Sequence, residues 1–164
     1  MKKNTRGFSL IELLIVVAII LIIAAIAIPN LLRSRIAANQ ASAVGSLRTI
    51  NTAEITYAST YNSGYAGALS YLGPGATGTN PTSTAAGLLD SVLAGAGNAS
   101  VKSGYAFAYT PSAVVQGRID TYTVTASPST VGTTGSNFYF TDMSGVIRQN
   151  TVGTASAADS PIGG

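Results

Sequence analysis

The chain has 164 residues, of which 46% are hydrophobic and only 9% are charged, a length that fits one compact domain plus an appendage. It contains no cysteine and no histidine, so the composition excludes disulfides, zinc–thiolate sites and histidine-based acid–base catalysis. The net charge of +3 is carried by Lys2, Lys3 and Arg6, so the rest of the chain is neutral and gives little reason to expect nucleic-acid binding.

A long apolar run follows this basic leader. The run covers residues 8–28, and at ~1.5 Å per residue its length of about 32 Å matches the ~30 Å thickness of the hydrocarbon layer. It is longer than the apolar part of a secretory signal peptide, and no small-x-small cleavage site with a polar start follows it. A plain transmembrane anchor explains the length and the basic flank, but it does not explain Glu12, the single carboxylate inside the run.

The N-terminal signature of type IV pilins and pseudopilins closely resembles residues 6–32, RGFSLIELLIVVAIILIIAAIAIPNLL. In that family a membrane peptidase cuts after the glycine and the new first residue is N-methylated. The resemblance therefore implies cleavage between Gly7 and Phe8 and methylation of Phe8. Glu12 falls at the fifth position of the mature chain, where the family carries a glutamate, and Pro29 matches the helix-kinking proline. We expect the backbone around residues 24–29 to bend or locally unwind.

Glu12 needs a partner if it is to lie among apolar helices. Cleavage after Gly7 creates an α-amine on Phe8, and in a staggered stack of identical helices the amine of an incoming subunit can lie beside Glu12 of its neighbour. Pairing offsets the desolvation of both charges, whereas a misregistered subunit leaves a buried charge alone at a cost of several kcal/mol. We therefore interpret Glu12 as a register device for assembly; the alternative is a glutamate that merely lies at the membrane interface.

The sequence becomes amphipathic beyond Pro29. Apolar residues recur at helical face spacings from Ile36 to Tyr61. This pattern predicts one helix from about Phe8 to about Tyr61, which at ~1.5 Å per residue would span about 80 Å. Its first half (residues 8–28) would lie in lipid or in a filament core, and its second half would pack on a head.

Residues 62–103 are rich in glycine, alanine, serine and threonine. We expect an irregular loop that folds onto the head rather than a linker between domains. Within it, residues 85–93 predict a short helix with Leu88, Leu89 and Val92 on one face.

Strand signals fill residues 104–150, where apolar and polar residues alternate between turn-forming segments. The four candidate strands are Tyr105–Tyr109, Thr121–Ala126, Asn137–Thr141 and Val146–Arg148. The predicted fold class is α+β, with the C-terminal half of the long helix packed on about four antiparallel strands. This layout resembles a type IV pilin head without the disulfide-closed loop of many pilins. Residues 151–164 have little to pack, and we expect a mobile tail.

The sequence predicts no catalytic, metal or cofactor site. The six acidic residues are scattered, and the many hydroxyl side chains have no histidine or cysteine to activate them. Residues 142–145 (DMSG) lack the spaced carboxylates of a calcium motif, so we interpret them as a tight turn.

The resemblance implies a structural subunit of a type IV pilus, a homo-oligomeric helical filament that serves adhesion, twitching motility or DNA uptake. The alternative is a pseudopilin of a type II secretion system. The implied partners are a prepilin peptidase, an inner-membrane assembly platform and membrane lipid before assembly; binding of nucleic acid stays open. The implied location is the inner membrane for the precursor and then the extracellular pilus.

Overall fold

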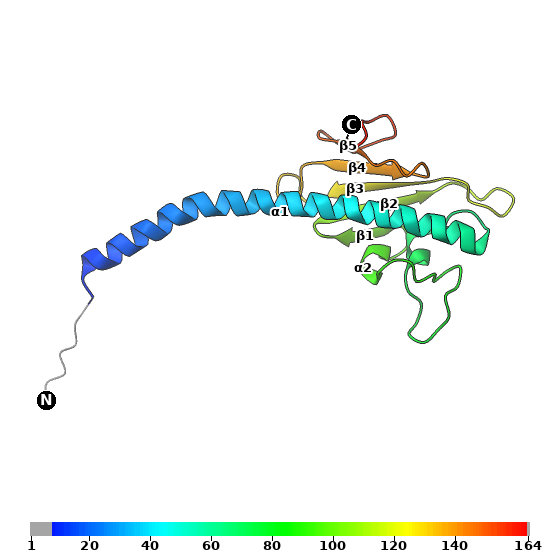
Figure 1. The fold of residues 1–164 in the computed structure, drawn as a ribbon, viewed down its shortest axis with the longest axis horizontal. Coiled ribbons are helices and arrows are strands. Elements are labelled where there is room, and N and C mark those ends of the chain that lie inside the picture. Colours follow the sequence, from blue (N-terminus) through cyan, green and yellow to red (C-terminus); the bar gives the residue numbers. More distant parts are fainter. Residues whose placement is uncertain (1–7, 164) are drawn as a thin grey trace. The chain divides into compact units, whose positions relative to one another are not determined.

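The computed structural model describes residues 8–163 (Figure 1). The elements in chain order are α1 (Leu10–Tyr61), the 3-10 helix η1 (Leu69–Leu72), α2 (Ser91–Ala94), β1 (Ala99–Lys102), β2 (Tyr105–Pro111), β3 (Tyr122–Pro128), β4 (Phe138–Asp142) and β5 (Arg148–Asn150). The described chain divides into two compact units, with the boundary between residues 35 and 36. One long N-terminal helix followed by an antiparallel sheet confirms the predicted α+β class.

The first unit contains the apolar part of α1. Its large apolar side chains are all exposed, with exposed fractions from 46% for Val17 to 80% for Leu10. The most apolar stretch of α1 has a mean hydropathy of 3.3, and none of it is buried. By length and composition, α1 is therefore able to cross a membrane.

Pro29 lies inside α1, and the helix is continuous on both sides of it. Of the two alternatives expected for residues 24–29, bending or local unwinding, this structure does not show the unwinding. A proline removes one backbone hydrogen bond, and its ring crowds the carbonyl four residues earlier, so its direct effect is limited to one turn. The alanines at positions 24, 25 and 27 favour helix strongly, so the neighbouring turns persist.

The second unit is the head, a five-stranded sheet in the order β1-β2-β3-β4-β5 with every neighbouring pair antiparallel. The additional strand is β1, which the sequence did not reveal because its pattern is inverted: Ser100 faces the core, while Val101 is 62% exposed. The last strand was placed two residues too early, since β5 covers Arg148–Asn150.

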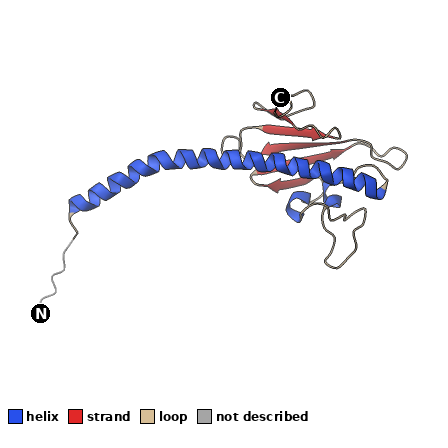
Figure 2. Cartoon of the chain, viewed as in Figure 1, coloured by secondary structure: helices blue, strands red, loops and turns tan. Residues whose placement is uncertain are grey.

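The C-terminal half of α1 lies across one face of this sheet (Figure 2). The predicted alternation in β2 is confirmed, because the aromatic side chains of Tyr105, Phe107 and Tyr109 are buried and the residues between them are exposed. Helix and sheet share one hydrophobic core, to which α1 contributes chiefly Leu47, Ile50, Ala53 and Tyr57 and β3 contributes Tyr122, Val124 and Ala126.

The segment expected to be an irregular loop, residues 62–103, packs on the head, but its residues 99–102 form strand β1. Leu69, Leu72, Leu89 and Leu93 from this segment are buried in the same core. Helix α2 is shorter than predicted because the Asp90 carboxylate accepts hydrogen bonds from two backbone N–H groups of its first turn and so fixes its start. As a result the predicted apolar face is wrong at Val92, whose side chain is 55% exposed.

The C-terminal tail is partly packed, contrary to the expectation that it has little to pack: Ala155 is buried and Ile162 lies against the core. The Asp159 carboxylate accepts a hydrogen bond from Asn150 Nδ2 at 2.9 Å, and the Ile162 N–H donates to the Ile147 carbonyl at 2.9 Å. The tail therefore runs along β5 and covers the edge of the sheet, which would otherwise offer unpaired backbone groups.

Candidate functional site

The predicted assembly residues lie on or next to the first part of α1. Gly7 falls outside the described residues, and Phe8 is the first residue described, with an exposed fraction of 78%. Glu12 lies in the first turn of the helix and Pro29 in its interior. At ~1.5 Å per residue, about 25 Å of helix separates the two, so they cannot act on the same contact.

Glu12 caps the N-terminus of its own helix. Its Oε2 accepts a hydrogen bond from the backbone N–H of Ser9 at 2.9 Å, and Ser9 is the residue immediately before α1. This is the carboxylate half of a capping box, and it also places a negative charge at the positive end of the helix dipole. The sequence signal for this cap is Ser-x-x-Glu at positions 9–12, which lies inside the apolar run.

The cap reduces the free-energy penalty expected when a neighbouring subunit is out of register. Glu12 has a hydrogen-bond donor within its own chain, so a misregistered neighbour would leave it with one partner rather than with none. A carboxylate accepts up to about four hydrogen bonds, so the Ser9 bond leaves capacity for a cation from another subunit. Local capping and pairing with a neighbour's amine are therefore compatible, although the penalty for misregister is smaller than for an unpaired charge.

Apolar surface surrounds the cap. Leu10, Leu13, Leu14 and Val17 line a shallow groove of about 270 Å³ on the first turns of α1. The groove has almost no polar surface, and its lining side chains are 46–80% exposed. A surface of this kind is typical of a segment that lipid or another helix covers.

Comparison with known proteins finds similarity in the N-terminal segment of the chain. Residues 2–28 match the family model described as prokaryotic N-terminal methylation motif. The type IV wide pilus major component PilA4 of Thermus thermophilus is 65% identical over 37 residues, which cover 23% of this chain and 28% of that protein. The type IV major pilin protein PilA of Myxococcus xanthus is 50% identical over 54 residues, which cover 33% of this chain and 24% of that protein.

The N-terminal segment of the chain is therefore similar to that of type IV pilins. The matched segments span only about a quarter of the length of these two pilins. No solved structure matches the chain.

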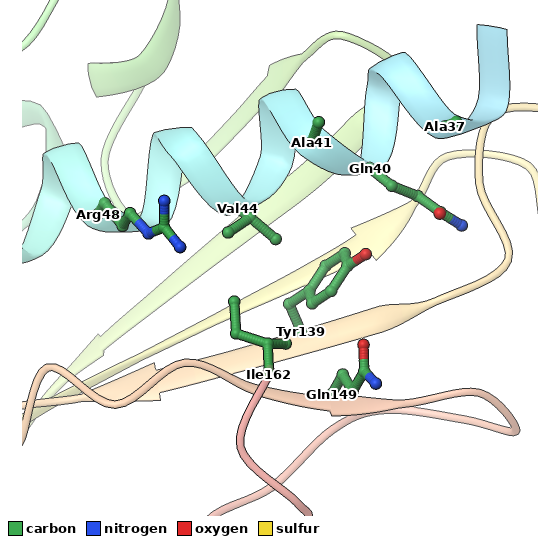
Figure 3. A pocket seen from close by; sticks show the side chains of 8 residues that line it. All are labelled: Ala37, Gln40, Ala41, Val44, Arg48, Tyr139, Gln149 and Ile162. Carbon is green, nitrogen blue, oxygen red and sulfur yellow. The ribbon is translucent and has the colours of Figure 1, made fainter. Parts of the chain in front are cut away.

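The head carries a groove of about 390 Å³ between α1 and the C-terminal tail (Figure 3). Val44 and Ile162 point toward each other across it, with Tyr139 from β4 between them. The other lining residues are Ala37, Gln40, Ala41, Arg48 and Gln149. Arg48 is the only charged residue in this lining, so the groove contains no acid–base pair and no set of carboxylate ligands.

A buried polar cluster joins α1 to two strands beneath it. Asn51 Nδ2 donates to the Thr141 hydroxyl at 2.9 Å, and the Tyr122 hydroxyl donates to Asn51 Oδ1 at 3.0 Å. The Thr141 hydroxyl in turn donates to the Val146 carbonyl at 3.2 Å. Because buried polar groups need such partners, this cluster specifies where the C-terminal half of α1 lies on the sheet.

Glu54 lies deeper in the head and has no exposed surface. Its Oε2 accepts a hydrogen bond from the Ala66 N–H at 2.9 Å, and burial raises the pKa of the carboxyl group from 4.5 to about 7. Sequence reasoning missed this residue, although the signal was available: Glu54 lies between Ile50 and Tyr57 at helical spacing, on the apolar face that packs on the sheet.

Proposed function

We propose that this chain is the structural subunit of a type IV pilus and assembles through the apolar half of α1 into a surface filament. The observation that carries the proposal is the full exposure of a long apolar helical segment that also bears the N-terminal methylation motif. Each large apolar side chain gains about 1.5–3 kcal/mol when it leaves water, so this segment requires a cover. Lipid supplies the cover before assembly, and copies of the same helix supply it afterwards.

Transfer from lipid to filament needs a driving force other than hydrophobicity, because lipid tails are as apolar as the side chains. Helix association in lipid depends on close packing and on polar contacts. Ala24, Ala25 and Ala27 allow close approach of neighbouring helices. Glu12 supplies the polar contact: we propose that it pairs with the α-amine of Phe8 of a neighbouring subunit and so selects the register.

Processing precedes assembly in this proposal. A prepilin peptidase cuts between Gly7 and Phe8, Phe8 is N-methylated, and an inner-membrane platform moves the processed chain into the growing filament. Pro29 lies where α1 leaves the most apolar segment, and we propose that it eases the change of helix shape on leaving the bilayer. The chain would then pass from the inner membrane to the extracellular pilus.

The pilus would serve adhesion, twitching motility or DNA uptake. The alternative is a pseudopilin of a type II secretion system, which uses the same N-terminal segment. The two relatives favour the pilus, since both are described as major pilus components. Deleting the gene separates the alternatives: a pilus subunit predicts loss of surface fibres with export intact, whereas a pseudopilin predicts retention of exported proteins in the periplasm.

The deciding experiment is intact mass together with N-terminal sequencing of protein sheared from the cell surface. We expect a chain that begins at N-methylated Phe8. Gly7→Ala is the matched variant: it should block cleavage, leave the longer chain in the inner membrane and abolish sheared fibres. Sheared fibres whose subunits begin at Met1, or normal cleavage of the variant, would contradict the proposal.

A further inference from the structure

The buried glutamate of the head has no role in filament assembly as proposed above. Glu54 has no exposed surface, although glutamate is almost never fully buried without a partner charge. The ion pairs within residues 8–163 are Lys102 with Asp90 and Arg118 with Asp120, and neither involves Glu54. The carboxyl group is thus buried without a cation to balance it.

The groups that face Glu54 are phenols. Tyr57 comes from α1, Tyr109 from β2 and Tyr122 from β3, and burial raises the pKa of each of them further, so all three are neutral at physiological pH. The charge of Asp142 raises the pKa of Tyr122 but does not contribute to the pKa shift of Glu54. A negative charge on Glu54 would therefore have only neutral dipoles around it.

Glu54 and Tyr109 bind the two backbone polar groups of one residue, Ala66. Glu54 Oε2 accepts the N–H of Ala66 at 2.9 Å, and the Tyr109 hydroxyl donates to the carbonyl of Ala66 at 2.7 Å. Ala66 is completely buried, and it begins the segment that brings Leu69 and Leu72 into the core. These two bonds thus fasten the chain that follows α1 to the helix and to the sheet.

The second carboxyl oxygen indicates which protonation state fits this site. Glu54 Oε1 is buried and has no hydrogen-bond partner. While the adjacent Tyr109 hydroxyl donates its proton to Ala66, it can accept a hydrogen bond from a protonated Glu54; turned toward Glu54, it would donate to the carboxylate and lower the pKa of Glu54. Burial is the larger cause and raises the pKa of Glu54, which favours the neutral acid. A neutral carboxylic acid satisfies the site better than a carboxylate.

We propose that Glu54 is a protonation-controlled latch: the neutral carboxyl group holds residues 62–72 against α1 and β2, and its ionisation loosens this segment. Other hydrogen bonds also hold this segment, among them the Tyr65 N–H to the Ile119 carbonyl at 2.8 Å and the Ser70 N–H to the Gly97 carbonyl at 2.9 Å, so ionisation loosens the segment locally rather than unfolding the head. The latch lies in residues 36–164 and does not depend on the filament-forming segment.

The direction of the pH effect follows from the raised pKa. In the closed segment, burial raises the pKa of Glu54 to about 7, whereas in an open segment the exposed Glu54 has the ordinary pKa of 4.5. The protonated carboxyl group therefore contributes its full stabilisation of the closed segment below pH 4.5, and this stabilisation is lost as the pH rises through 7. With these two values, the opening equilibrium should rise roughly 70-fold between pH 5 and pH 9.

The test is amide hydrogen exchange of the full-length chain in detergent micelles, read on peptides from residues 62–72 and corrected for the intrinsic effect of pH. Wild type should lose protection across the pH range by the factor given above. Glu54→Gln keeps an acceptor for Ala66 and cannot ionise, so its protection should be nearly independent of pH. Asp120→Asn removes an exposed carboxylate and should keep the wild-type pH profile.

Equal pH dependence in wild type and Glu54→Gln would overturn the proposal. If Glu54→Gln fails to fold, infrared spectroscopy of the wild-type chain gives the answer. A protonated carboxyl band that persists at pH 6 and disappears by pH 9 supports the latch, and a spectrum with every carboxyl group ionised at pH 6 refutes it. Neither readout requires filaments, so failure of the pilus proposal would be seen separately.

Discussion

Replacing Asn51 by alanine should destabilise the head by about 3 kcal/mol. The Tyr122 hydroxyl would lose its acceptor inside the core, which costs about 1–3 kcal/mol for a buried group. The Thr141 hydroxyl would lose a donor but would keep its bond to the Val146 carbonyl, so its contribution is smaller, about 1 kcal/mol. Loss of the carboxamide atoms also leaves a small cavity.

Urea unfolding of the full-length chain in micelles, followed by near-UV circular dichroism of its tyrosines, measures this effect. For a domain of this size the midpoint should fall by roughly 2 M. Asn80→Ala is the matched control, because Asn80 is exposed in a loop and its replacement should leave the midpoint within about 0.3 M.

A double-mutant cycle with Tyr122→Phe tests the mechanism rather than the size of the effect. Tyr122→Phe alone removes the hydroxyl that donates to Asn51. In that background Asn51→Ala no longer leaves a buried hydroxyl without its acceptor, so it should lower the free energy of unfolding by less. The double variant should be more stable than the sum of the single effects by at least about 0.5 kcal/mol. Strict additivity would show that the two side chains do not act as one cluster.

Two further changes test the assembly segment and the turn after α1. Glu12→Ala should leave the head folded but reduce the yield of sheared filaments. Glu12→Gln keeps the acceptor for the Ser9 N–H, so a reduced filament yield in this variant would show that the negative charge is needed. A near-normal filament yield of the glutamine variant would limit the role of Glu12 to capping the helix. Gly64→Ala should lower the free energy of unfolding by about 3 kcal/mol, because its φ is +78° and a Cβ would lie 2.1 Å from the Ile119 carbonyl oxygen. Gly78→Ala, with φ +84° and open space around it, should cost only about 1 kcal/mol in the same urea titration, and equal losses would show that the contact with Ile119 is unimportant.

The parts of the fold that the sequence predicted are those in which local pattern and burial agree. The alternation of Tyr105, Phe107 and Tyr109 required one buried face, and the structure has it. Strand β1 could not be found in this way, because Ser100 faces inward and Val101 faces outward, so pairing with β2 rather than the hydrophobic pattern creates the strand. The tail was misjudged for a related reason: the hydrogen bonds of Asp159 replace apolar burial there, and composition does not reveal them.

Site residues divide along the same line. The assembly segment depends on motif and apolar length, which one sequence displays directly. The polar groups inside the head depend on partners that are distant in sequence: Asn51 meets Thr141 across 90 residues, and Glu54 meets Ala66 only because residues 62–66 turn back along α1. A polar residue on the predicted apolar helix face is the one available signal, and Glu54 shows it; Asn51 was expected off that face, which is wrong because its side chain is buried.

The two glutamates of α1 show how one long helix can place carboxyl groups in apolar surroundings by different means. Glu12 lies in the first turn, where its carboxyl group accepts a hydrogen bond from the backbone N–H of Ser9 and is exposed to a neighbouring chain. Glu54 lies in the interior of the helix, where every backbone N–H already has a helical partner, so its carboxyl group depends on the folded chain after α1. A helix end can therefore present a charge to a partner, whereas a buried position in a helix interior favours the neutral acid. This difference agrees with the two proposed roles, assembly for the first glutamate and control of the head for the second.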